Sequence, residues 1–152
     1  MEFLLRHFFL KSLFIILQSL LIFGNAFATN TSTGTNALSS LTTGSRNTAN
    51  GYESLYSNTS GSENTAVGYQ SLYSNSTADD NTALGYLSLY SNSTGEFNTA
   101  LGNQSLKSNS TGKLNTAVGR KSLNENTTGN WNTAVGADSM RANTTGYDNT
   151  AI

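Results

Sequence analysis

The stretch Asn64-Thr65-Ala66-Val67-Gly68 returns 17 residues later as Asn81-Thr82-Ala83-Leu84-Gly85, and this spacing is kept to the end of the chain. The triplet Asn-Thr-Ala begins at Asn47, Asn64, Asn81, Asn98, Asn115, Asn132 and Asn149, and a degenerate Asn-Thr-Ser begins at Asn30. A fixed period of this length is typical of a solenoid, in which each coil contacts only its neighbours. We therefore expect an all-β fold, a parallel β-solenoid or β-roll of seven 17-residue coils.

Coils are numbered here from coil 1, which begins at Asn30, to coil 7, which begins at Asn132, with a partial coil from Asn149. Places within a coil are counted from the Asn of Asn-Thr-Ala, so that the consensus reads N-T-A-x-G-x-x-S-L-x-x-N-x-T-G-x-x. Glycine holds places five and fifteen, with Ala78 as the exception, which predicts corners there. Places eight to twelve fit a second strand or one short helical turn, because periodicity does not separate the two over so short a run.

Two places are bulky and apolar in nearly every coil, and both are predicted to point into the coil as stacked columns. Place four holds Val67, Leu84, Leu101, Val118, Val135 and Ile152. Place nine holds Leu55, Leu72, Leu89, Leu106 and Leu123. Because side chains alternate along a strand, an inward Val67 turns the place-one Asn and the place-three Ala outward. That small, uncharged outer row would suit burial against another chain, whereas the charged residues, which avoid places one to five, are expected on the outside.

Asparagine and threonine also repeat in register. The place-one ladder is Asn47, Asn64, Asn81, Asn98, Asn115 and Asn132, and a second Asn ladder runs through place twelve from Asn58. Stacked amides can hydrogen-bond along the axis, and we favour this structural role, although place twelve also matches the N-x-[ST] glycosylation acceptor. The place-two threonines form a file of the kind that ice-binding proteins present. Strand alternation puts them on the same side as Val67, inside the coil, which disfavours that function.

Tyrosines form two short files in coils 2 to 4. Place six holds Tyr52, Tyr69 and Tyr86, and place ten holds Tyr56, Tyr73 and Tyr90. Aromatic side chains in adjacent coils can pack on each other, which we favour, or can offer a surface to a sugar or a protein. These six residues are the candidate binding surface.

The composition argues against catalysis, metal binding and nucleic-acid binding. The chain has no cysteine, and its single histidine, His7, lies near the N-terminus, so we expect no enzyme, no cofactor and no metal site. Asp79-Asp80 is the one adjacent acidic pair and a weak calcium candidate. A net charge of −1 gives no basic stripe for nucleic acid.

Residues 1–28 read as a cleavable signal peptide. Arg6 and Lys11 precede a short apolar run, and Ala26-Phe27-Ala28 fits the small-x-small cleavage pattern. The competing interpretation is a membrane anchor, but the run is short of the roughly 20 residues that span a bilayer. We therefore predict a secreted or cell-surface protein whose mature solenoid, residues 29–152, does not insert into a membrane.

The repeat N-T-A-[VL]-G-x-x-S-L-x-x-N-[ST]-T-G resembles the head repeats of YadA-like trimeric autotransporter adhesins, and it is similar to repeats of tail-fibre-domain proteins. The resemblance covers residues 30–152. It implies a left-handed parallel β-roll, a homotrimer, and attachment to a protein or glycan of a host surface. The sequence stops in phase with the repeat and lacks the stalk and anchor of the adhesins, so we expect a fragment of such a head or shaft. The alternative function is a monomeric solenoid that binds a carbohydrate or ice.

Overall fold

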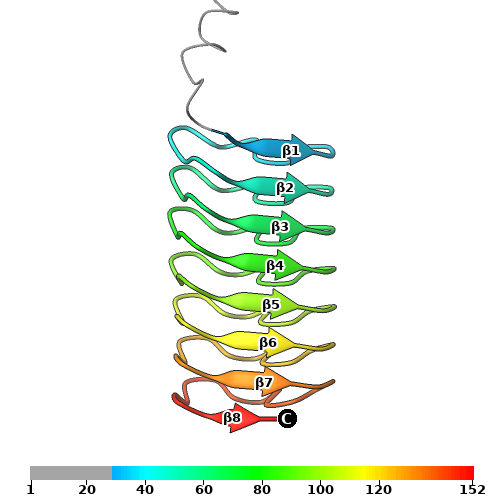
Figure 1. Ribbon diagram of the computed structural model, residues 1–152, viewed down its shortest axis with the longest axis vertical. Helices are drawn as coiled ribbons and strands as arrows, with labels where there is room; N and C mark the ends of the chain where they lie inside the picture. Colours follow the sequence, from blue (N-terminus) through cyan, green and yellow to red (C-terminus); the bar gives the residue numbers. More distant parts are fainter. Residues whose placement is uncertain (1–28) are drawn as a thin grey trace, which may run out of the picture.

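The computed structural model describes residues 29–152, which form a stack of coils with one short strand in each (Figure 1). The strands are β1 (Thr31–Thr33), β2 (Thr48–Asn50), β3 (Thr65–Val67), β4 (Thr82–Leu84), β5 (Thr99–Leu101), β6 (Thr116–Val118), β7 (Thr133–Val135) and β8 (Thr150–Ala151). They make one sheet in the order β1 to β8. The all-β parallel solenoid is thereby confirmed. The predicted signal peptide lies outside the described residues.

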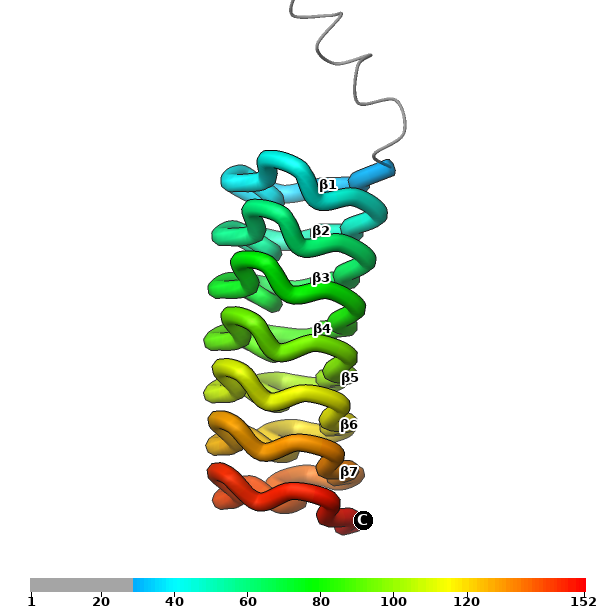
Figure 2. The backbone as a smooth tube through the Cα atoms, turned by 90° about the vertical axis from the view of Figure 1, so that its left-hand side faces the viewer, coloured from blue at the N-terminus to red at the C-terminus, as the bar shows by residue number. Residues whose placement is uncertain are grey.

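Adjacent strands pair in parallel with a register shift of one whole repeat. Thr65 of β3 lies opposite Thr82 of β4, and Ala66 lies opposite Ala83. The same pairing joins every neighbouring pair of strands, so each strand residue lies beside its counterpart in the next coil. Figure 2 shows the coils stacked one over another. No helix long and apolar enough to cross a bilayer occurs in residues 29–152.

Places five to twelve form neither a second strand nor a helical turn, but two consecutive tight turns. In coil 3, Ser71 N donates to Gly68 O at 3.4 Å and Asn75 N donates to Leu72 O at 3.2 Å. Gln70 and Leu72 both have a φ of 50°, which is uncommon for residues with a side chain. The N–H of each reaches a neighbouring coil, at Tyr52 O (2.8 Å) and Ser88 O (3.0 Å). The turns are therefore hydrogen-bonded from coil to coil much as the strands are.

One half of the interior is apolar, and its composition corrects the expected alternation. The place-nine leucines are fully buried, as predicted, and they pack against the place-three alanines, such as Ala66 at 0 % exposure. The prediction that place four points inward was wrong, because Val67 is only half-buried and Leu84 is 49 % exposed. The coil is thin, and an inward methyl group from Ala already fills the space opposite the leucine.

The other half of the interior is built from amides. Asn64 Nδ2 donates to Ala78 O at 2.8 Å and to Asn47 Oδ1 at 3.2 Å. Asn75 Nδ2 donates to the same Ala78 O at 3.0 Å and to Asn58 Oδ1 at 3.2 Å. The two predicted Asn ladders therefore exist, and they meet on the carbonyl of place fifteen. Buried amides are tolerated there because every one of these Nδ2 groups has a partner.

Glycine is favoured at places five and fifteen for different physical reasons. Gly102, at place five, has a φ of 138°, and a Cβ there would lie 2.6 Å from Gly119 O. Gly112, at place fifteen, has an ordinary φ but faces Gly129 O and Asn109 Oδ1 at clashing distance from any Cβ. Ala78 shows that place fifteen accepts a methyl group if the coil shifts.

The shift leaves two traces in coil 3. Most coils donate two N–H groups to one place-thirteen carbonyl, as Ser93 N (2.9 Å) and Thr94 N (3.2 Å) do to Ser110 O. In coil 3 only Ser76 N donates, to Ser93 O at 3.2 Å. One rung of the place-one ladder is also altered, because Asn81 Nδ2 bonds Asp79 O at 3.0 Å in place of the amide of the coil before.

Candidate functional surfaces

The six tyrosines of the candidate surface stack on one another. Ring centroids at place six are 5.2 Å apart between Tyr52 and Tyr69, and 5.5 Å apart between Tyr69 and Tyr86. At place ten the separations are 5.1 and 5.2 Å, with interplanar angles of 4° and 14°. The interpretation that aromatics of adjacent coils pack on each other is confirmed. Because the central ring of each file has a neighbour on both faces, a sugar can stack fully only on the end rings.

Between the two tyrosine files, place seven holds Glu53 in coil 2 and Gln70 in coil 3, and Leu87 in coil 4. Glu53 raises the pKa of the Tyr52 hydroxyl, chiefly through a side-chain hydrogen bond. Desolvation raises the pKa of Tyr73, and the charge of Glu53 adds to it. The Glu53 carboxylate therefore faces both files, and it is held in place by Gln70 Nε2 at 2.7 Å. These hydroxyls and the carboxylate can hydrogen-bond a ligand at the ring edges.

The outer side of the strands, here called the sheet face, carries two parallel files. The Thr file holds place two of each strand, and the Val/Leu file holds place four, namely Val67, Leu84, Leu101, Val118 and Val135. The prediction that the threonines lie inside was wrong. Places two and four lie on the same side of the strand, and that side faces outward. The expected outer row of Asn and Ala is buried inside the coil, so it cannot form an interface with another chain.

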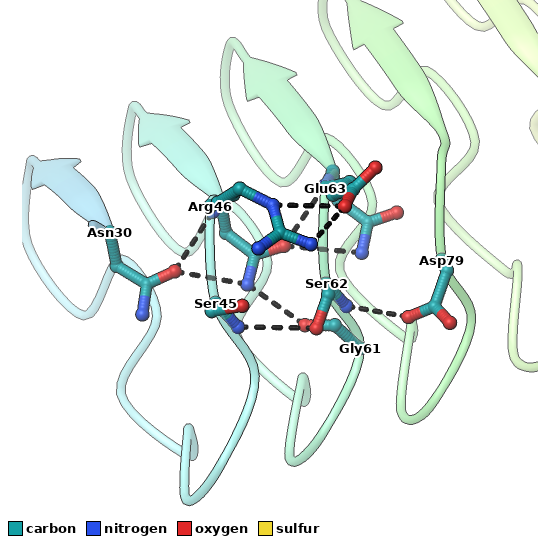
Figure 3. A network of polar contacts seen from close by, with 9 residues as sticks. Asn30, Ser45, Arg46, Gly61, Ser62, Glu63 and Asp79 are labelled. Carbon is teal, nitrogen blue, oxygen red and sulfur yellow. Dashed lines mark hydrogen bonds and ion pairs between the residues drawn. The ribbon is translucent and has the colours of Figure 1, made fainter. Parts of the chain in front are cut away.

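A third file of side chains borders the sheet face at place seventeen, and it changes character along the stack. In the first coils Arg46 forms an ion pair with Glu63, and at the neighbouring place sixteen Ser62 N donates to Asp79 Oδ1 at 2.7 Å (Figure 3). Farther along, the same place holds Phe97, Leu114 and Trp131, which are 52 %, 45 % and 58 % exposed. This edge of the sheet face is therefore ionic in coils 1 to 3 and apolar in coils 4 to 6, and coil 7 carries a charged residue there again, Asp148.

The acidic residues of the first half interact with each other. The Arg46 guanidinium lowers the pKa of Glu63. Partial burial raises the pKa of Asp80, and the hydrogen bond and charge of Glu63 raise it further. Among residues 29–152 no group of three or more His, Cys, Asp or Glu residues is placed to hold a metal ion, and Asp79 uses its carboxylate to accept a backbone N–H.

The place-twelve asparagines are unavailable to a glycan in the folded protein. Asn92 is 0 % exposed, and its Nδ2 donates to Asn75 Oδ1 at 2.9 Å and to Gly95 O at 2.8 Å. A sugar on this nitrogen would replace a donor that the interior uses. The structural interpretation of this ladder is confirmed.

The sheet face is the feature that sequence reasoning missed, although the repeat itself contained a signal. Place four is Thr33 in coil 1 and Asn50 in coil 2, whereas place three is always Ser or Ala. Tolerance of a polar side chain at place four is what an outer position shows. Comparison of the chain with protein-family models, with curated proteins and with solved structures found no match.

Proposed function

We propose that the protein is a non-enzymatic, exported structural repeat protein that serves as the head or shaft of a surface adhesin or fibre. The observation that carries the proposal is the exposed sheet face on a regular rod. A ladder of Val and Leu side chains runs beside uncharged threonines over consecutive coils. Leu84 and Val135 are 49 % and 36 % exposed, and the other members are half-buried. Contiguous exposed apolar surface of this kind marks interaction sites.

The partner that fits the sheet face is a second and third copy of the chain. Another solenoid of this sequence offers the same repeat along its axis, so Val and Leu side chains can interdigitate coil by coil. Exposed aromatic residues at the edges, such as Trp131 and Tyr69, are the types enriched in protein interfaces. The adhesin resemblance supports a parallel homotrimer, in which each chain buries its sheet face toward the common axis.

Light scattering of the purified protein tests the trimer, and two substitutions locate its interface. Leu101→Lys puts a charge in the centre of the Val/Leu file and is expected to give a monomer, because a buried unpaired charge is strongly unfavourable. Thr111→Lys puts the same charge at an exposed corner away from this face and should leave the trimer intact. A native protein that is a monodisperse monomer would remove the trimer from the proposal.

Export is tested by the N-terminus of the mature protein. The proposal expects the protein to be recovered from the cell surface or the medium with a first residue near Thr29. A protein that retains residues 1–28 in a membrane fraction would indicate an anchor.

The alternative is a monomer that binds a carbohydrate at the tyrosine files. The exposed hydroxyls and Glu53 favour it, although stacking covers most of each inner ring. Replacement of Tyr69, Tyr73, Tyr86 and Tyr90 by Ala should then abolish binding on a glycan array while the β-sheet circular dichroism signal is kept. Unchanged binding would discard this site. The same array and immobilised matrix proteins test the proposed attachment to host surfaces.

A further inference from the structure

The hydroxyl groups of the Thr file are not used by the fold. At place thirteen, by contrast, Thr59 Oγ1 donates to Ser76 O at 3.0 Å and Thr127 Oγ1 donates to Thr144 O at 3.0 Å. The Thr file of residues 48 to 133 shows no such bond in the described part of the chain, and its members are half-buried or exposed. Their hydroxyls are therefore available to something outside the coil.

The Thr file and the Val/Leu file together make a regular two-dimensional array. Along the axis the spacing is the strand separation of about 4.8 Å, and across the strand it is two residues, or about 6.6 Å. Each row presents one hydroxyl beside two or more methyl groups, as in Thr99 and Leu101 of β5. Register pairing keeps these rows aligned from β3 to β7 without a slip.

The interior fixes this array in place. Beneath the sheet face lie the alanines and the place-one amides, such as Asn98, whose Nδ2 donates to Gly112 O at 2.8 Å and Asn81 Oδ1 at 3.2 Å. A fully satisfied buried network of this kind restricts the relative motion of the coils. Contacts with a ligand that are weak one by one can therefore add along the rod. The conformational entropy of ordering the binding surface is already lost when the protein folds, so binding does not have to supply it.

The charge of the strip narrows the class of ligand. Places one to five carry no charge in any coil. An ionic ligand would therefore lose hydrating water at the sheet face without gaining an ion pair in return. A fitting ligand is neutral, flat and rigid, offers hydrogen-bonding groups at a fixed repeat, and has voids that accept methyl groups. The surface of ice meets all these conditions.

We propose that the sheet face, through the Thr file and the Val/Leu file of β3 to β7, binds ice. The threonine hydroxyls join the outermost layer of water molecules, and the methyl groups of Thr, Val and Leu sit in the openings between them. This inference does not rest on the proposed trimer, and the two exclude each other, because a trimer that buries the sheet face leaves no surface for ice.

Ice-affinity partition of the fluorescently labelled protein tests the inference, with matched substitutions. Thr99→Tyr places a bulky side chain in the middle of the Thr file, and Thr111→Tyr places the same side chain at an exposed corner outside the array. Both are expected to keep the native circular dichroism spectrum and melting temperature, because Thr99 lies in a strand, which accepts tyrosine, and Thr111 is exposed at a corner. The wild type and Thr111→Tyr should enter a growing ice hemisphere, and Thr99→Tyr should be depleted by about tenfold, since it lifts several rows off the lattice.

Two results would overturn the inference. One is exclusion of the wild type from ice, and the other is equal incorporation of the two variants. Light scattering of the same samples separates this failure from that of the proposed function. A trimer excluded from ice would support the adhesin or fibre proposal, whereas a monomer excluded from ice would remove both the ice-binding inference and the proposed trimer.

Discussion

The two halves of the coil interior solve the same packing problem with opposite chemistry. On one side Leu106 and Ala100 are fully buried and make only apolar contacts, and on the other Asn98 and Asn109 are as deeply buried but bonded at every rung. The apolar half draws its stability from removal of surface from water. The amide half draws its stability from the absence of orphaned donors. The comparison teaches that a thin coil can be stabilised by side chains that hydrophobicity alone would place outside.

The largest expected loss of stability comes from a substitution at the place-five glycine, where the strand leads into the turns. Gly102→Ala combines a φ of 138° with a Cβ only 2.6 Å from Gly119 O, so we expect a loss of about 4 kcal/mol or more in the free energy of unfolding. Urea denaturation followed by circular dichroism measures it.

Gly112→Ala is the matched control for that substitution, since it adds the same methyl group at the other corner. Ala78 occupies this place in coil 3, and we expect a loss of only about 1–2 kcal/mol. Equal losses at the two corners would show that crowding, and not backbone conformation, selects glycine.

The second prediction compares the halves directly. Leu106→Ala should lower the free energy of unfolding by about 2–5 kcal/mol through the cavity it leaves. Asn98→Ala should cost a similar amount, about 2–4 kcal/mol, because Asn115 Nδ2 and its backbone N–H lose their acceptor. If Asn98→Ala lowers the free energy of unfolding by less than about 1 kcal/mol, the hydrogen bonds of the amide half contribute little to stability.

A third prediction concerns the altered rung at coil 3. Ala78→Gly should let the Thr77 N–H reach a partner and let Asn81 Nδ2 return to Asn64. After the entropic cost of glycine is subtracted, we expect a gain of about 1 kcal/mol. Hydrogen exchange of the Thr77 amide should slow in this variant, and an unchanged rate would mean that the coil keeps its shift.

The smallest effect on stability is expected on the outer surface, at the acidic residues Glu63 and Asp80. The raised pKa of Asp80 means that its neutral form is favoured in the folded protein. Its contribution is therefore favourable at low pH and is lost as the pH rises through that pKa. Glu63, with a lowered pKa, contributes in the opposite sense, favourably above its ordinary pKa.

Asp80→Asn should accordingly raise the melting temperature slightly at pH 7 and leave it nearly unchanged at pH 3. Differential scanning calorimetry at the two pH values measures the difference. Asp148→Asn, at the same place in the last coil but fully outside the acidic cluster, is the control. A larger gain at pH 3 would contradict the assigned direction.

The repeat allowed the fold, the register, the Asn ladders and the buried leucines to be predicted, because a strict period forces equivalent residues to stack. It did not determine which side of the strand faces inward. A strand shifted by one residue exchanges its two faces, and the bulk of Val67 favoured the wrong choice. What decides the question is the space left by Leu72, together with the carbonyl of Ala78 that needs two amide donors. Both are properties of the closed coil and are not visible in a single repeat.

The direction of the Asn rungs has a consequence for how such rods assemble. Asn64 Nδ2 donates to Asn47 and Asn92 Nδ2 donates to Asn75, so both columns point their N–H groups toward the N-terminal end. Backbone bonds outside the strands have the opposite bias, because coil 4 donates five N–H groups to coil 5 and three to coil 3. The dipoles of the amide columns and of these backbone bonds therefore oppose each other along the rod. Rods that lie side by side in one direction consequently meet little electrostatic repulsion from their interiors.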